Sequence, residues 1–165
     1  MKQILGAAAV AVLASATVAQ SSVVFAFNES GSDLVGVLSG TLDLTGAAVS
    51  QPGLADTVFD AFLRPNEAFL VAGGGTFDFI GYEISGPSAI GSGLQANGSY
   101  TGDLFTIDGL TLDLRLDQSF TGGALSGTLT LPGTTIADLG LTGDTFVWTL
   151  TNDETVTVTF GLGPG

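Results

Sequence analysis

Hydrophobic and polar residues alternate along most of this chain with a period of two. Residues 110–116 are the clearest case, because four leucines fall on one side while Thr111, Asp113 and Arg115 fall on the other. Residues 124–131 repeat the pattern with leucine and glycine on the inner side. A period of two places alternate side chains on opposite faces of an extended backbone. Each run therefore predicts a half-buried β-strand.

The same criterion, together with enrichment in β-branched and aromatic residues, predicts about nine or ten short strands. They are residues 22–28, 34–44, 68–72, 76–85, 104–107, 110–116, 124–131, 145–150 and 155–162. The first two are expected to form an antiparallel pair, and no segment is long enough for the crossover helix of a parallel unit. Turn residues separate the strands every 8 to 12 residues, as in a sandwich or barrel. We predict an all-β fold, a single antiparallel β-sandwich, with a jelly roll as one form of it.

Three segments are less regular. Residues 56–63 fit one or two helical turns, because their apolar side chains share a face, or a loop held by Phe59 and Phe62; we favour the loop. Residues 136–139 fit a single helical turn. Within 82–103, Gly86-Pro87 and Gly91-Ser92-Gly93 predict a glycine- and serine-rich loop between two strands.

The first 19 residues have the features of a secretory signal peptide. Lys2 forms a positive start, an apolar run follows, and small residues precede a cleavage point after Ala19 that leaves Gln20 first. The alternative is a buried N-terminal helix. The apolar run is too short for a comfortable membrane span. We expect a secreted protein, extracellular or periplasmic, with residues 20–165 as a single β-sandwich domain and no membrane span in the mature chain.

Charge and composition exclude several classes of function. The chain has 16 acidic residues against three cations, giving a net charge of −13, and this charge disfavours nucleic acids and anionic membranes as partners. It has no cysteine and no histidine. Disulfides, thiol nucleophiles, thiolate metal sites, Ser-His-Asp triads and imidazole-bound zinc are therefore impossible.

Carboxylates are the remaining candidates for catalysis and metal binding. Asp103 and Asp108 flank a short predicted strand, and Glu83 and Asp113 lie on strands. No acid–base motif joins them, so we interpret the first two as turn residues and Asp113 as part of a solvated strand face. We predict no catalytic residue, no cofactor and no enzyme activity. Calcium is a weaker alternative, held near Asp103 and Asp108 or by residues 152–154, because carboxylates in turns are suitable hard ligands.

Aromatic side chains are the candidates for carbohydrate binding. Tyr82, Tyr100 and Trp148 could each provide a platform on which a sugar ring stacks. For Trp148 we favour a place in the core, because large aromatics usually anchor β-sandwiches. Tyr100 is the best candidate for an exposed ring.

Two runs of the sequence resemble a known family. The first contains Gly86-Pro87-Ser88, Gly91-Ser92-Gly93 and residues 99–105 (SYTGDLF); the second contains residues 125–128 (LSGT), 136–142 (IADLGLT) and 144–149 (DTFVWT). Together they resemble exported bacterial proteins with a PEP-CTERM or VPLPA-CTERM sorting signal. The similarity extends over about residues 24 to 160. The chain ends at residues 161–165 without the family's proline-rich signature, apolar helix and basic end, so this member is either released or truncated.

The resemblance implies export and an association with exopolysaccharide or other matrix components. Our leading hypothesis is a secreted, non-enzymatic protein of the cell surface or extracellular matrix. The second hypothesis is a carbohydrate-binding module of the β-sandwich type. A secreted glycan-active enzyme is a distant third.

Overall fold

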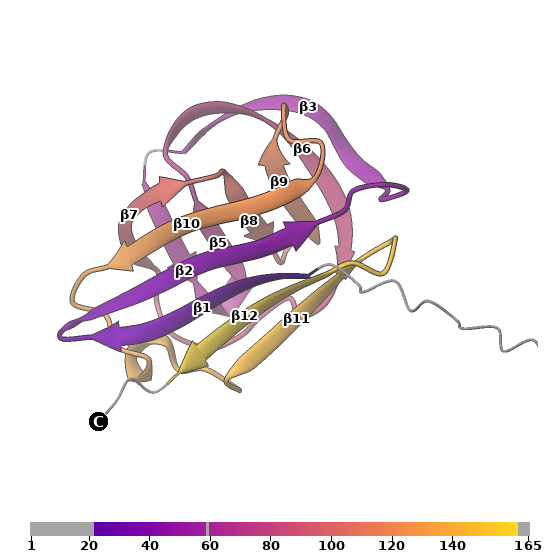
Figure 1. Ribbon diagram of the computed structural model, residues 1–165. Helices are drawn as coiled ribbons and strands as arrows, with labels where there is room; N and C mark the ends of the chain where they lie inside the picture. Colours follow the sequence, from indigo (N-terminus) through magenta and orange to yellow (C-terminus); the bar gives the residue numbers. More distant parts are fainter. Residues whose placement is uncertain (1–21, 59, 162–165) are drawn as a thin grey trace, which may run out of the picture.

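The computed structural model describes residues 22–58 and 60–161 (Figure 1), so the predicted signal peptide lies outside the described residues. The described chain forms twelve strands and two short 3-10 turns, which confirms the prediction of an all-β fold. The elements are β1 (Ser22–Ser30), β2 (Asp33–Leu42), β3 (Val49–Val58), β4 (Ala61–Arg64), η1 (Pro65–Glu67), β5 (Phe69–Ala72), β6 (Gly75–Ser85), β7 (Ala96–Gly102), β8 (Phe105–Asp108), β9 (Asp113–Asp117), β10 (Gly123–Leu131), η2 (Ala137–Leu139), β11 (Thr145–Leu150) and β12 (Thr155–Gly161).

Eleven of these strands close into a barrel. Their order around the ring is β11-β12-β1-β2-β10-β7-β4-β5-β8-β9-β6, and β6 pairs back to β11 through Ser85 with Thr149 and Ile84 with Leu150. Strand β3 lies outside the ring and pairs with β6. The predicted sandwich is therefore wrong, because a sandwich keeps two separate sheets, whereas this sheet returns to its own first strand.

The barrel turns a corner at β7. Its first half, around Asn97, pairs with β4, and its second half, around Tyr100, pairs with β10. Gly98 lies between the two halves, and a Cβ atom there would strike the backbone carbonyl oxygen of Thr130. The absence of a side chain at Gly98 lets β10 approach closely enough for the sheet to continue around the corner.

Strands β1 and β12 are parallel, with Val23 opposite Val156 and Phe27 opposite Phe160. The expectation of a purely antiparallel sheet is therefore wrong at this pair. A parallel pair needs a long connection, which usually contains a helix. Here the connection is the whole of the intervening chain, because β1 and β12 are neighbours in the ring but the first and last strands along the sequence.

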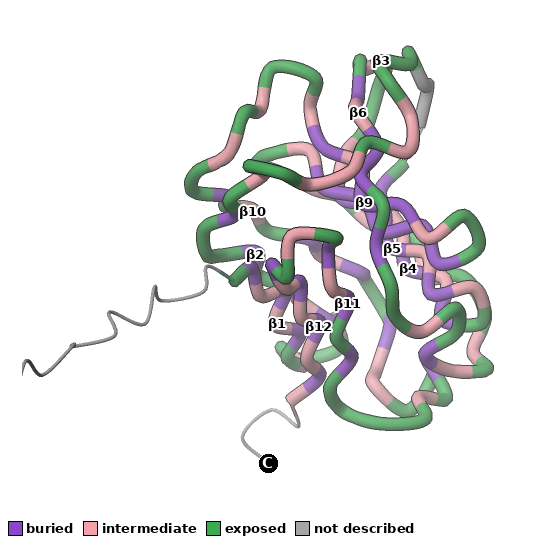
Figure 2. The backbone as a smooth tube through the Cα atoms, turned by 90° about the vertical axis from the view of Figure 1, so that its right-hand side faces the viewer, coloured by how far each residue is buried: buried purple, intermediate pink, exposed green. Residues whose placement is uncertain are grey.

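The inward-facing side chains fill the barrel with a continuous apolar core. Figure 2 shows buried residues alternating with more exposed ones along β1 and β12, as the period of two predicts. Phe25, Phe27 and Phe160 stack in sequence, with ring centroids 4.9 and 5.0 Å apart. Trp148 and Phe105 are also fully buried. The core therefore crosses from the first strand to the last.

Two segments differ from the sequence prediction. The strand predicted from residue 110 begins only at Asp113, because Leu112 has a positive φ of 56° and Leu110 lies in an exposed turn. Residues 56–63, for which we favoured a loop over helical turns, are mostly strand, because 56–58 belong to β3 and 61–63 to β4, so both interpretations are wrong there. Phe59, one of the two residues expected to hold the loop, lies outside the described residues. The predicted single turn near residues 136–139 corresponds to η2.

Candidate functional site

The glycine-rich loop that follows β6 interlocks with the loop that follows β10. The backbone N–H of Ser92 donates to the carbonyl of Gly140 (3.0 Å), and that of Gly93 donates to Leu139 (2.9 Å). In the other direction, the N–H of Thr142 donates to Ile90 (2.9 Å). The two motif runs singled out in the sequence thus form one joined unit, although about fifty residues separate them in the chain.

Close packing explains the glycines of the Gly91-Ser92-Gly93 motif. A Cβ atom at Gly91 would lie 2.5 Å from the carbonyl oxygen of Leu139, and one at Gly93 would strike that of Asp138. Real Cβ atoms do not approach backbone oxygens so closely. The spacing of these glycines is therefore a requirement of backbone-to-backbone packing.

Trp148 fixes the start of the same loop. Its side chain is only 1% exposed, and its indole Nε1 donates to the carbonyl of Pro87 at 3.0 Å. A Cβ atom at Gly86 would collide with the indole ring. Trp148 is therefore a core residue, as we favoured, and its faces are covered, so they provide no platform for a sugar.

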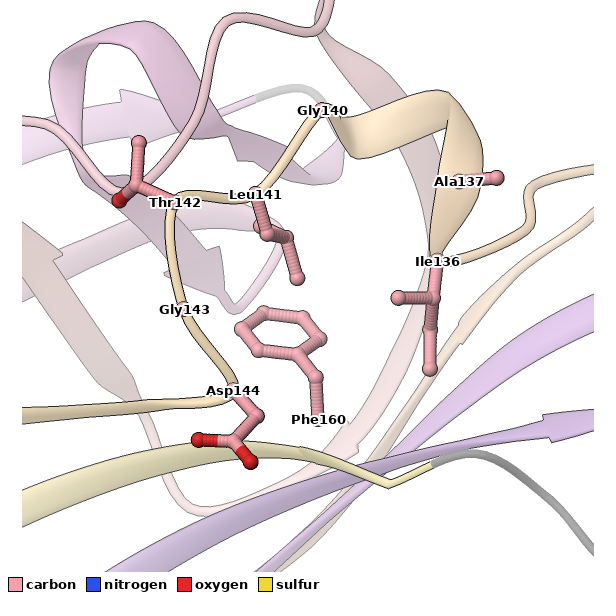
Figure 3. A pocket seen from close by; sticks show the side chains of 8 residues that line it. All are labelled: Ile136, Ala137, Gly140, Leu141, Thr142, Gly143, Asp144 and Phe160. Atoms are coloured by element: carbon pink, nitrogen blue, oxygen red, sulfur yellow. The ribbon is translucent and has the colours of Figure 1, made fainter.

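A hollow of about 470 Å³ lies beside the interlocked loops (Figure 3). Ile136, Leu141 and Phe160 direct apolar side chains into it, and Asp144 carries a carboxylate at its edge. The backbone N–H of Phe160, in β12, donates to the Asp144 carbonyl at 2.8 Å, and this bond joins the edge of the hollow to β12. Specific small-molecule sites combine an apolar wall with several convergent polar groups. The polar groups of this hollow are one carboxylate and the Thr142 hydroxyl, which donates to the carbonyl of Ile90, so few polar groups converge there to select a ligand.

The two tyrosines lie apart and are engaged within the fold. Tyr82 belongs to the core and is only 8% exposed, and this burial raises the pKa of its hydroxyl. Tyr100 is half-buried with its ring over Gly127, and its hydroxyl donates to the carbonyl of Asp103 at 2.6 Å. Burial, and then the nearby Asp103 carboxylate, raise the pKa of Tyr100. Tyr82, Tyr100 and Trp148 do not form a shared stacking surface.

Asp108 is the last residue of β8, whereas Asp103 lies two residues before the strand begins, so the two carboxylates are on either side of it. Asp103 Oδ2 accepts from the backbone N–H of Ser126 (2.7 Å), whereas Asp108 Oδ1 accepts from that of Leu110 (3.0 Å). Both therefore act as turn residues, as the sequence suggested. Among the described residues, no group of three or more acidic side chains is arranged to hold a metal ion.

The alternative calcium ligands at residues 152–154 fasten one turn to another. The Asn152 side-chain amide donates to the carbonyls of Asp43 (2.8 Å) and Thr45 (3.2 Å). Glu154 Oε2 accepts from the backbone N–H of Asp43 at 3.3 Å. These contacts join the turn before β12 to the turn after β2, so Asn152 and Glu154 have a structural role there.

Sequence reasoning missed a buried polar cluster on the outer wall of the barrel. Arg115 places one guanidinium nitrogen 2.7 Å from Asp108 Oδ2 and 3.8 Å from Asp113 Oδ2. Gln51, on β3, donates from Nε2 to Asp113 Oδ2 at 2.8 Å. Asp113 is buried, so its assignment to a solvated face is wrong, because Gln51 of β3 reaches over it. The alternation of polar and apolar residues along β9 does not indicate that β3 covers the polar side of the strand. The bond from Gln51 to Asp113 joins β3 to β9, in addition to the pairing of β3 with β6.

No family model, curated protein or solved structure matches the chain. Among residues 22–58 and 60–161, no helix is long and apolar enough to cross a membrane. A functional assignment therefore depends on the chemistry of this chain's own residues.

Proposed function

We propose that this protein is an exported, non-enzymatic component of the bacterial cell surface or extracellular matrix. The features of residues 1–19 support export. The resemblance of the Gly86–Gly93 and 136–149 runs to exported proteins with sorting signals supports a place outside the cell. The barrel, with its interlocked loops, is the part that would act there.

The use that the chain makes of its carboxylates carries the non-enzymatic part of the proposal. Asp43, Asp117 and Asp138 each accept hydrogen bonds from a hydroxyl and a backbone N–H two or three residues away, and these bonds lower the pKa of all three carboxyls. A general acid at neutral pH needs a raised pKa. These carboxylates are therefore adapted to stabilise turns.

Asp138 illustrates this structural use. Its Oδ2 accepts from the backbone N–H (2.8 Å) and the hydroxyl (2.7 Å) of Thr135, whose hydroxyl oxygen accepts from the Asp138 N–H at 3.3 Å. This reciprocal pair has the arrangement of a capping box. It supports η2, the turn that interlocks with the Gly91-Ser92-Gly93 loop.

Cell fractionation tests the proposal. The full chain is expressed with its leader in a bacterial host, and the mature protein is expected outside the cytoplasm with Gln20 as its first residue by mass spectrometry. A matched variant, Leu13→Arg, interrupts the apolar run of the leader and is expected to keep the uncleaved protein inside the cell. Uncleaved wild-type protein in the cytoplasm would contradict export. Release of sugars from glycans by the purified protein would contradict the non-enzymatic assignment.

A carbohydrate-binding role is the second candidate function. The outer face formed by β10, β2, β1, β12 and β11 is uncharged, which favours this role. This face does not include the aromatic side chains that the sequence suggested as platforms.

A further inference from the structure

Five neighbouring strands, β10, β2, β1, β12 and β11, lie side by side on one side of the barrel (Figure 1). Their outward-facing residues align across the strands through the pairing register: two rows cross all five strands, and a third consists of Ala124 beside Thr41 and of Ser22 beside Thr155 and Thr149. We call these fifteen residues the threonine face: Ala124, Ser126 and Thr128 of β10; Val37, Ser39 and Thr41 of β2; Ser22, Val24 and Ala26 of β1; Thr155, Thr157 and Thr159 of β12; and Thr145, Val147 and Thr149 of β11.

The threonine face is uncharged although the protein carries 16 acidic residues. Ten of its side chains end in a hydroxyl, and the other five are valine or alanine. Val37 and Val147 are 46% and 44% exposed, so the face is open to solvent. Its side chains are short, and the threonines and valines are stiff at χ1, so little conformational entropy is lost when they are covered.

Charge limits what this face can bind. An anionic polymer would be repelled by the net charge of −13, and a cationic polymer would be drawn to the carboxylates elsewhere on the surface. The face offers neither kind of polymer a compensating charge. An uncharged polymer is not repelled by the net charge, and the uncharged threonine face complements it.

A second copy of the chain fits this face poorly. Five strands spaced by about 4.8 Å and three rows spaced by about 6.7 Å cover roughly 480 Å². A stable protein interface needs about 800 Å² from each partner, with an apolar core rich in aromatic residues and Met. The threonine face is smaller, and two thirds of its side chains are hydroxylic.

We propose that the threonine face binds an uncharged polysaccharide. Each hydroxyl both donates and accepts hydrogen bonds, as sugar hydroxyls do, and the methyl groups of Val37, Val24 and Val147 contact the C–H faces of the sugar rings. The shallow face gives weak binding per site, and repeated attachment along a polymer multiplies it. This inference rests on the proposed matrix function, for which it names the partner.

Affinity electrophoresis of the purified mature chain in gels containing a soluble neutral glucan tests the proposal, with a uronic-acid polymer as the anionic comparison. Val37→Glu and Thr157→Glu each place one charge within the face, Thr157 in its middle row and Val37 in an adjacent one. The matched control is Leu94→Glu, which adds the same charge at a side chain that is 89% exposed outside the face. We expect the neutral glucan to retard the wild type and Leu94→Glu, and about tenfold weaker binding in both face variants, because each buries an unpaired charge against the glycan.

Thr157→Val removes a hydroxyl while keeping the shape and charge of the side chain, and it is expected to weaken binding without a change in melting temperature. Equal effects of Val37→Glu and Leu94→Glu would overturn the proposal, as would stronger retardation by the anionic polymer or no retardation by neutral glucan. Loss of self-association in the face variants, measured by analytical ultracentrifugation, would identify the face as a contact between copies and would also overturn it. The measurement uses purified protein, so its failure is distinct from a failure of export.

Discussion

At the scale of single residues, the fold places aromatic rings on glycines. The Trp148 indole occupies the space beside Gly86, and the Tyr100 ring occupies that beside Gly127. Gly36 is covered in the same way by Phe27 and its neighbour Phe25. A glycine in a strand leaves a gap that a ring from an adjacent segment can fill. Glycines of the described strands therefore serve packing as well as turns.

Replacing Trp148 tests this arrangement. Trp148→Ala is expected to lower the free energy of unfolding by about 3 kcal/mol or more, because it leaves a cavity beside Gly86 and removes the bond to Pro87. Trp148→Phe is the matched control, which keeps most of the ring, and it is expected to lose less. Urea unfolding followed by circular dichroism measures both. An unchanged midpoint in Trp148→Ala would show that the ring contributes little to the core.

At the scale of elements, the sequence was most informative for long strands with one buried and one exposed face. Strands β1, β2, β10 and β12 were predicted within a few residues for this reason. Strand β7 was missed because ANGSYTG contains the residues of a loop, and only its two partners, β4 and β10, hold it extended. Residues 110–112 were misassigned because Asp108 accepts bonds from the N–H groups of Leu110 and Thr111, which forms a turn despite the alternation.

The interlocked loops could be recognised as motifs but not as partners. Nothing in Gly91-Ser92-Gly93 indicates that residues 139–142 lie against it, because the contacts join backbone atoms of segments far apart in the chain. The buried cluster of Asp108, Asp113 and Arg115 is similar in this respect. Its cover comes from Gln51 of β3, in a stretch where no strand was predicted.

A pair of glycine substitutions tests the interlocked loops. Gly91→Ala places a methyl group 2.5 Å from the Leu139 carbonyl oxygen, and it is expected to destabilise the protein by about 1–3 kcal/mol. Gly74→Ala is the control, since its Cβ meets nothing within 4 Å, and it is expected to be neutral or slightly stabilising. Hydrogen exchange at the Ser92 and Gly93 amides measures the local effect. Unchanged protection in Gly91→Ala would mean that the loops separate without consequence.

At the scale of the whole molecule, the sequence predicted which faces are buried but not how the sheet closes. The alternation of polar and apolar residues distinguishes the exposed face of a strand from its buried face, and it is the same in a sandwich and in a barrel. Closure depends on strand edges: β7 passes from one partner to another at Gly98, and β6 reaches β11 through only two residue pairs. The β6–β11 seam is therefore the feature that distinguishes the barrel from the predicted sandwich.

Engineered cysteines test this seam directly, because the chain has no cysteine of its own. Ser85 and Thr149 are directly opposed across the seam, so Ser85→Cys with Thr149→Cys is expected to form a disulfide and to stabilise the barrel by about 2–4 kcal/mol. Thr155 is the next residue in the same row, paired with Thr149 on the far side from Ser85. Ser85→Cys with Thr155→Cys therefore spans two strand spacings, about 10 Å, which is too far for a disulfide. Thiol titration of the dilute, oxidised proteins measures the difference. Free thiols in the first variant, or equal linkage in both, would mean that β6 and β11 do not meet and that the sheet is open at this edge.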